Sequence, residues 1–147
     1  MPTIQSTYSA QHARWYEGMV LNQEPSTIVT RVAEDAEGIG FGKVCVQGTA
    51  DNQVVDSEAT VKFCGIAIAD AGQPGDTYAQ YANVAVMKKG VVVVQASVAV
   101  AVGDAVYYVP ATGVLTNSAS GNTLIAGAQW DTSTSGAGLA ALRLNTP

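Results

Sequence analysis

The sequence predicts an all-β protein: a small β-barrel or β-sandwich, with a jelly roll among the topologies left open, built from two similar halves. Short apolar runs rich in valine and isoleucine recur at roughly 8–12-residue spacing between turns of glycine, proline and asparagine, which is typical of such folds. The pattern also runs twice, because residues 39–46 are echoed by 102–109 at an offset of 63 positions. Helical periodicity is nearly absent, and only residues 9–19 could form a turn or two.

The echo extends in both directions along the chain. The further matching runs are 28–31 with 91–94 and 63–68 with 125–130. We therefore expect a single β domain over residues 28–147, made of half-repeats at about 28–90 and 91–147. Gly40 and Gly103 fall on each other in this alignment and are expected to mark equivalent strand entries.

In the first half, apolar runs predict strands at 28–32, 41–47, 61–69 and 81–87. An acidic, solvated turn is expected at 34–38. A loop is expected at 70–76, where glycine and proline supply the backbone angles that turns need. Lys88-Lys89-Gly90 then predicts a tight turn between the two halves, with the glycine at positive φ.

In the second half, strands are predicted at 91–95, 106–109, 124–130 and 139–144. Val98, Val100 and Val102 alternate with two alanines, a period of two that is typical of a strand with one large-residue face. Turns are expected at 110–113 and 132–138. Trp130 is expected in the core because it lies in a strand-like run, and Leu142 and Leu144 are expected on one face.

Residues 1–27 differ from the rest of the chain and predict an extended N-terminal arm. They show no sustained period of 2 or 3.6, carry both charge signs, and are bounded by Pro2 and Pro25. Large aromatic side chains dominate interface energetics, so the arm is the candidate interface with a partner or with another subunit. Its candidate contact residues are Tyr8, His12, Arg14, Trp15, Tyr16 and Met19. The alternative is that the arm folds back over its own barrel.

Composition narrows the class of partner. Charged residues make up 13% of the chain, against roughly 25% in a typical soluble domain, and charge is depleted at the cores of interfaces. The net charge is −5 and no basic stripe exists, which argues against nucleic-acid binding. The N-terminus lacks a signal-peptide pattern and no run reaches 18 apolar residues, so secretion and membrane spanning are not expected.

Side chains that could carry chemistry are sparse, so we expect no enzyme, no cofactor and no metal. His12 is the single histidine, and two cysteines are too few for a structural zinc site. Cys45 and Cys64 are expected to be small buried hydrophobes in a reducing compartment, or else a bridge between neighbouring strands. The glycine-rich run 38–43 lacks the spacing of a phosphate-binding loop. A paired-carboxylate site at 34–37 is the less favoured alternative to a solvated turn.

The order and spacing of several runs resemble the capsid cement, or decoration, proteins of tailed bacteriophages from about residue 8 to the end. These runs are PSTIVTRVAE (25–34), GIGFGKV (38–44), GIAI (65–68), YANVAVMKKG (81–90), GDAVY (103–107) and ATGVL (111–115). The resemblance implies a β-rich protein that clamps the major capsid protein on the outer surface of an expanded head. It further implies a homodimer or homotrimer at lattice junctions, assembled in the cytoplasm of the host bacterium.

Two other functions stay open from the residues. The protein could be a host-surface or glycan-binding decoration of the head, in which case loops 70–80 and 131–138 would form the working surface. Alternatively, Lys88 could be a modified lysine on a hairpin, as in biotinyl and lipoyl carrier domains, although those domains are about half as long and carry different residues around the lysine.

Overall fold

The computed structural model describes residues 15–56 and 62–145, which form an almost entirely β structure. The elements are β1 (Thr27–Ala33), β2 (Ile39–Gly40), β3 (Val44–Gln47), β4 (Gln53–Val55), β5 (Phe63–Ala67), the 3₁₀ turn η1 (Pro74–Asp76), β6 (Thr77–Tyr78), β7 (Asn83–Ala96), β8 (Ala105–Tyr108), β9 (Leu115–Thr116), β10 (Thr123–Trp130) and β11 (Gly138–Asn145). No α-helix occurs in these ranges. The predicted all-β class is therefore confirmed.

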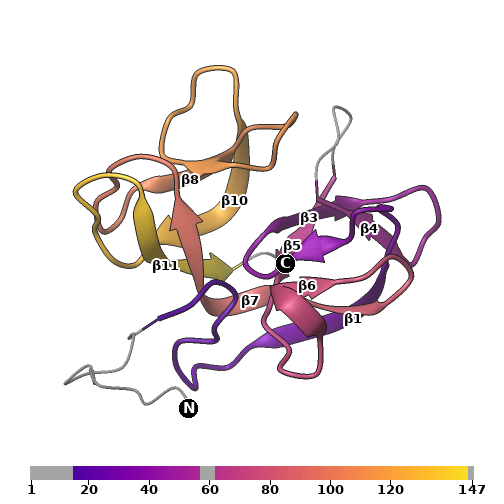
Figure 1. Ribbon diagram of the computed structural model, residues 1–147. Helices are drawn as coiled ribbons and strands as arrows, with labels where there is room; N and C mark the ends of the chain where they lie inside the picture. The colour runs from indigo at the N-terminus through magenta and orange to yellow at the C-terminus, as the bar shows by residue number, and fades with distance from the viewer. Residues whose placement is uncertain (1–14, 57–61, 146–147) are drawn as a thin grey trace, which may run out of the picture.

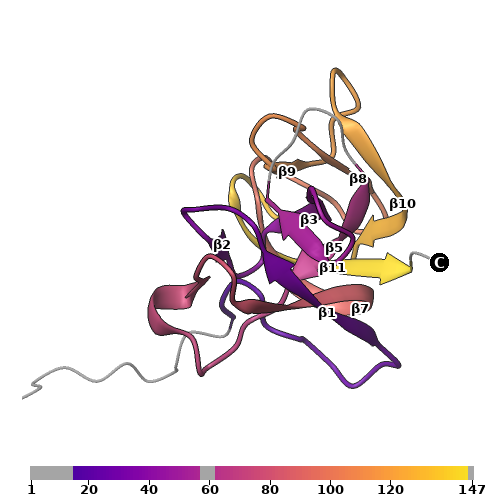
Figure 2. The ribbon, with the colours of Figure 1, turned by 90° about the vertical axis from the view of Figure 1, so that its right-hand side faces the viewer.

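The strands form two closed rings that share β7. In the first ring the hydrogen-bonded order is β1, β4, β3, β5 and β7, and β1 pairs again with β7. In the second the order is β7, β11, β10, β8 and β9, and β9 pairs again with β7. We call these the first and second barrels. Figure 1 shows them side by side with β7 passing between them, and Figure 2 shows them from the side.

The two barrels repeat one pairing pattern, which confirms a fold built from two similar halves. Each has one parallel pair, and its other pairs are antiparallel. Equivalent partners are Ala33–Val54 and Ala96–Leu115 in the parallel pairs, and Val44–Ile66 and Ala105–Gln129 in the antiparallel pairs. The duplication seen in the sequence is thus a duplication of strand order and register.

The equivalence of Gly40 and Gly103 is wrong by two residues. Gly42 precedes β3 at φ +74, as Gly103 precedes β8 at φ +90, whereas Gly40 is a strand residue. The amide of Gly42 donates to the carbonyl of Ala67 at 2.7 Å, and that of Gly103 donates to Trp130 at 2.8 Å. A turn with one residue in the left-handed region favours glycine. This shared requirement makes Gly42 the equivalent of Gly103, whereas the alignment of apolar residues points to Gly40.

The tight turn predicted at Lys88-Lys89-Gly90 is also wrong. β7 runs without interruption through these residues, and Gly90 pairs with Leu144 of β11. Because β7 forms backbone hydrogen bonds with strands of both barrels, it continues through the residues where the sequence alone suggests that it ends. Gly90 has φ +130, and a side chain there would come within 3.0 Å of Ser26, so glycine lets β7 bend as it leaves the first barrel. The proposed junction of the half-repeats lies inside this strand.

The remaining differences concern short segments. The predicted strand through Val98, Val100 and Val102 does not form. Only Val100 makes a backbone bridge, to Thr134, and only its side chain is buried; the other two side chains are exposed. Phe41 and Gly42 form a turn before β3 instead of opening that strand. The very short strands missed from the sequence are β2, β4, β6 and β9. Two or three residues are too few to show a period.

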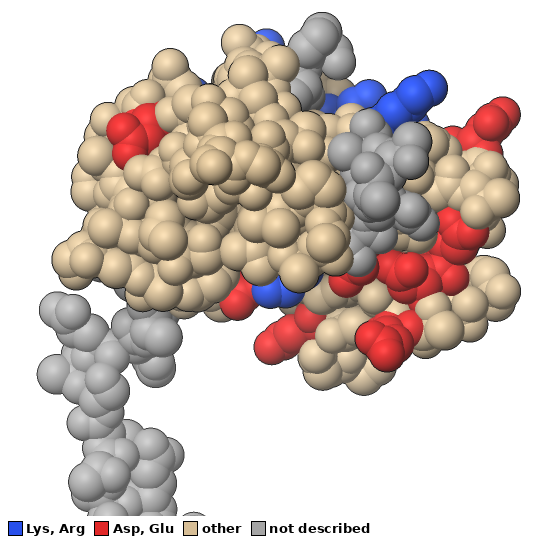
Figure 3. Space-filling view, turned by 90° about the horizontal axis from the view of Figure 1, so that it is seen from above, with Lys and Arg blue, Asp and Glu red and all other residues tan. Residues whose placement is uncertain are grey.

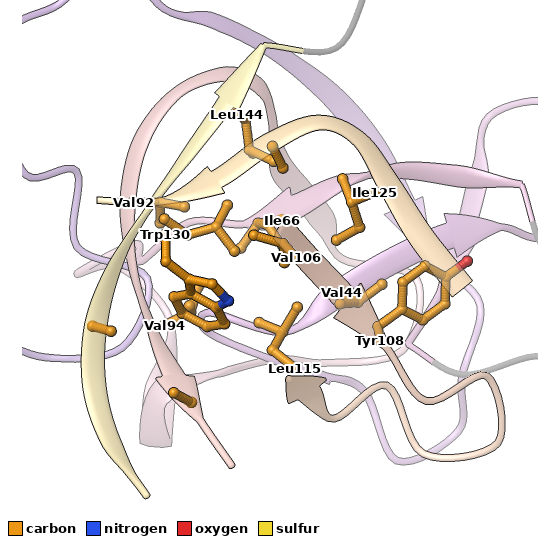
Figure 4. Packing of buried hydrophobic residues seen from close by; sticks show 14 of the residues in the cluster. Val44, Ile66, Val92, Val94, Val106, Tyr108, Leu115, Ile125, Trp130 and Leu144 are labelled. Carbon is orange, nitrogen blue, oxygen red and sulfur yellow. The ribbon is translucent and has the colours of Figure 1, made fainter. Parts of the chain in front are cut away.

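Two clusters of buried side chains make up the core. The larger one spans both barrels, and Figure 4 shows Val44 and Ile66 of the first barrel meeting Val106, Ile125 and others of the second. The smaller cluster fills the first barrel. The expected burial of Trp130, Leu142 and Leu144 is confirmed. Because the larger cluster crosses the junction, the two barrels share one hydrophobic core at that point.

The two cysteines are free thiols rather than a bridge. Cys45 is completely buried, as expected, whereas Cys64 is only half-buried. Burial raises the pKa of the Cys45 thiol far above its ordinary value, so this group stays neutral and behaves as a small hydrophobe.

Candidate protein-binding surface

Residues 18–21, in the described part of the predicted arm, lie alongside β7. The amide of Gly18 donates to the carbonyl of Val93 at 2.8 Å, the amide of Val93 donates to Met19 at 2.9 Å, and that of Leu21 donates to Val91 at 3.1 Å. These bonds make residues 18–21 a short antiparallel partner of β7. From residue 15 onward, the chain follows the alternative in which the arm folds back over its own barrel.

Gly18 allows this close approach. It has φ +82, and a Cβ there would lie 2.7 Å from the amide nitrogen of Ala69 and 2.9 Å from the Cβ of Phe41. Its carbonyl accepts a hydrogen bond from Ala69 at 2.8 Å. The segment is therefore held between β7 and the chain that follows β5, at a point where only glycine fits. An ion pair of 3.1 Å joins the adjacent Glu17 to Lys43, but both side chains are partly exposed, so it adds little stability.

A second anchor joins the arm to the second barrel. Arg143 of β11 donates hydrogen bonds to the carboxylates of Glu24 and Asp131, the latter at 3.2 Å. One guanidinium can bind two carboxylates at once because it presents several donors in a planar fork. The chain that enters β1 is thus connected to both barrels.

The predicted interface residues are only partly placed by the structure. Tyr8, His12 and Arg14 lie outside the described residues. Trp15 and Met19 are half-buried, whereas Tyr16 is 59% exposed. Of the two described aromatic residues proposed from sequence, Tyr16 therefore has the ring more available to a partner.

Tyr16 borders a groove at the junction of the two barrels. A hollow of about 570 Å³ adjoins a second one of about 250 Å³, and both are lined by Lys43 and Gln95. The first hollow is also lined by Tyr16, Glu17, Gly40, Phe41, Gly75, Asp76, Thr77 and Leu139, and the second by Gly42, Asp56, Ser97, Thr112, Gly113, Val114 and Leu115. We call the two together the junction groove. Its mixed apolar and polar lining suits an extended protein segment.

Sequence reasoning missed most of this groove. Phe41 comes from the turn before β3, Gln95 from β7 and Leu139 from β11. These residues are far apart in the chain and share no motif. They meet because the two barrels share a strand, and no signal in the sequence could have identified that arrangement.

The other chemical hypotheses gain no support from the described residues. Across residues 15–56 and 62–145, no group of three histidine, cysteine or acidic side chains is placed to hold a metal ion. Within the same ranges, no helix is long and apolar enough to span a membrane. The carrier hypothesis is wrong in its geometry, because Lys88 lies inside β7 rather than on a hairpin turn.

Comparison with known proteins identifies the family. A family model described as structural cement protein, with E217 gp24 and Pam3 gp6 as its named examples, matches residues 4–145. The chain belongs to the phage structural cement protein family. The resemblance noted in the sequence is therefore confirmed, and with it a structural, capsid-associated role in the virion.

The fold of this cement protein is also known from a solved structure. It is similar to a chain in the capsid of Myoviridae phage XM1, with a TM-score of 0.78 and 17% sequence identity, and the match covers 97% of each chain. At this identity the likeness establishes the shared fold. No curated protein sequence matches this one.

Proposed function

We propose that this cement protein binds the outer surface of the major capsid protein lattice and stabilises the expanded head of its phage. The family match over residues 4–145 carries the proposal. The similarity of the whole fold to a chain from a phage capsid is consistent with it. The role is structural rather than enzymatic, because reinforcement of a shell requires contact area and rigidity rather than a reaction centre.

The architecture suits a clamp between neighbouring capsomers. β7 belongs to both barrels, and the larger core cluster crosses the junction, so a load on one barrel passes to the other through buried contacts. The chain around Gly18 and Glu24 is fixed to this body by backbone bonds and by Arg143. A binding surface on such a support loses little conformational entropy on association.

The proposed lattice contact combines the arm with the junction groove. Tyr16 supplies an exposed ring at the groove edge, and Trp15 and Met19 add partly exposed apolar surface beside it. Tyr8, His12 and Arg14 extend the proposed contact toward the N-terminus. We further propose that two or three copies associate at lattice junctions. The acidic charge of the chain disfavours nucleic acid as a partner.

Paired tyrosine variants test this contact. Tyr16→Ala should weaken cosedimentation with expanded heads that lack the protein by on the order of tenfold, because an aromatic side chain that becomes buried in an interface is worth more than about 1 kcal/mol. Tyr81→Ala is the matched control, since Tyr81 is 68% exposed on the first barrel and away from the groove lining. Equal binding by both variants would remove Tyr16 from the contact.

An arm truncation tests the tether. It should end at residue 14, because a deeper cut also removes the bonds of residues 18–21 to β7 and confounds folding with binding. The truncated protein is expected to fold with an unchanged circular dichroism spectrum and to lose head binding. Full-strength binding would show that residues 1–14 are not needed for attachment.

A further inference from the structure

The second barrel carries very little charge. Only three of the 57 residues from 91 to 147 are charged, against 13 of the 63 from 28 to 90. In the face shown in Figure 3, the second barrel is almost uniformly uncharged, whereas acidic side chains gather over the first. The scarcity of charged residues in the chain is therefore largely a property of its second half.

The three charged residues of the second barrel are engaged by neighbouring groups. The carboxylate of Asp104 accepts hydrogen bonds from the amide of Ala101 at 2.9 Å and from Asn117 at 2.8 Å. Arg143 and Asp131 bind each other, and Arg143 also binds Glu24. All three residues are only partly exposed. A partner approaching this barrel would therefore have few fully hydrated charges to desolvate.

One end of this barrel combines the missing charge with exposed apolar side chains. Val98 is 41% exposed and Val102 is 65% exposed, on the segment that the sequence wrongly predicted to be a strand. The neighbouring exposed residues are Ala99, Ala101, Ser133, Ser135 and Ala137. We call these seven residues the valine platform.

The platform is rigid. Val100, between the two exposed valines, is buried and bridges to Thr134. The amide of Thr134 donates to the carbonyl of Val100 at 2.9 Å, its hydroxyl donates to Val98 at 3.3 Å, and the hydroxyl of Ser133 accepts from the amide of Val102 at 3.2 Å. The two segments are therefore held together before any partner arrives, which lowers the entropy cost of docking.

We propose that the valine platform docks on an uncharged, apolar patch of the capsid shell and so adds a second contact to the one made by the arm and the junction groove. This assignment rests on the proposed attachment to the capsid. Scattered exposed valines are ordinary on soluble proteins. Here, however, they lie together on the half of an acidic protein that lacks free charge.

The test measures binding of three proteins to expanded heads that lack the cement protein. The double variant Val98→Asp, Val102→Asp should lose binding by on the order of tenfold or more, because carboxylates must be desolvated against an apolar patch. Ala71→Asp, which adds a charge to an exposed loop of the first barrel, should bind like the wild type. The double variant Val98→Thr, Val102→Thr keeps the side-chain shape and should show a smaller loss of binding. This variant keeps the test decisive if the aspartate variant fails to fold.

Salt and self-association complete the test. The ratio between the affinities of the wild type and of the Val98→Thr, Val102→Thr variant should not change between about 50 mM and about 500 mM NaCl, since an uncharged contact is not screened. If the valine variants bind heads as tightly as the wild type does, the proposed docking of the valine platform is refuted, whereas the proposed attachment to the capsid still stands. Absence of wild-type binding would refute the proposed function and the platform with it. A sedimenting oligomer of free protein that the aspartate variant dissociates would instead assign the platform to contacts between copies, and so overturn the capsid assignment.

Discussion

Replacement of Gly18 by alanine should detach the segment that carries Tyr16 from the barrels. Two effects add. A residue with a Cβ pays about 1–2 kcal/mol to adopt the left-handed region, and Gly18 has φ +82. The new methyl would also lie 2.7 Å from the amide nitrogen of Ala69, which is backbone and cannot rotate away. Displacement of the segment then breaks four backbone hydrogen bonds, worth about 1 kcal/mol each: Gly18 to Val93, Val93 to Met19, Leu21 to Val91 and Ala69 to Gly18.

The expected loss in the free energy of unfolding is therefore about 4 kcal/mol, the sum over these four bonds, because the detached segment no longer carries the backbone strain. Gly103→Ala is the matched control, because Gly103 has φ +90 but no heavy atom within 4 Å of the added Cβ. It should cost only the backbone term of about 1–2 kcal/mol. The difference between the two variants reports how closely Gly18 is packed against its neighbours.

Urea unfolding gives the two free energies, and hydrogen exchange followed by mass spectrometry locates the effect. In the Gly18→Ala protein, the amides of Ala69 and Val93 should exchange faster, because they donate to Gly18 and Met19. Gly103→Ala should leave both amides protected. Equal losses of stability in the two variants, with unchanged exchange at Val93, would refute the proposed close packing of this segment against β7.

Three further predictions concern the body of the protein. Trp130→Ala should lower the free energy of unfolding by about 3–5 kcal/mol in urea titrations, since this buried indole is central to the larger core cluster; a loss below about 1 kcal/mol would contradict its burial. Hydrogen bonds from the hydroxyl and, to a smaller extent, the amide of Thr49 lower the pKa of Glu34 below its ordinary value of 4.5. These bonds should therefore stabilise the folded protein above that pH, and the stabilisation should be lost as the pH falls through the lowered pKa of the folded state. Glu34→Gln should flatten this acid limb of the urea midpoint, and an unchanged limb would exclude the carboxylate as its source. Iodoacetamide should modify Cys64 slowly in the native protein and Cys45 only after unfolding, as read by intact mass, because burial raises the pKa of both thiols and Cys45 is inaccessible.

The sequence was informative wherever a pattern is local. Alternating apolar residues and turn residues predicted most of the longer strands, and the burial of Trp130, Leu142 and Leu144 followed from the same patterns. The repeat was visible because duplicated barrels need the same order of strands and turns. The predictions failed where local signals conflict with pairing. Lys88-Lys89-Gly90 has the composition of a turn, yet backbone bonds to neighbouring strands keep it within β7.

The candidate site was accessible to sequence reasoning in one respect. Tyr16 was selected because exposed aromatic residues favour interfaces, and the structure places its ring at the edge of the junction groove. Phe41, Gln95 and Leu139 could not be selected in this way. Each looks like an ordinary strand or turn residue until the two barrels bring them to one surface.

The sequence by itself determined the all-β class, the twofold repeat and the membership of the cement family, since these depend on the order and spacing of residue types along the chain. Only the tertiary structure decided that the halves share one strand, that the segment after residue 15 lies on β7, and that Val100 is buried while Val98 and Val102 are exposed. The physical reason is that a two-residue period puts all three valines on one face only if the segment is a strand, and pairing with distant segments decides whether it is. Pairing between distant segments makes that choice, and with it the surface presented to a partner.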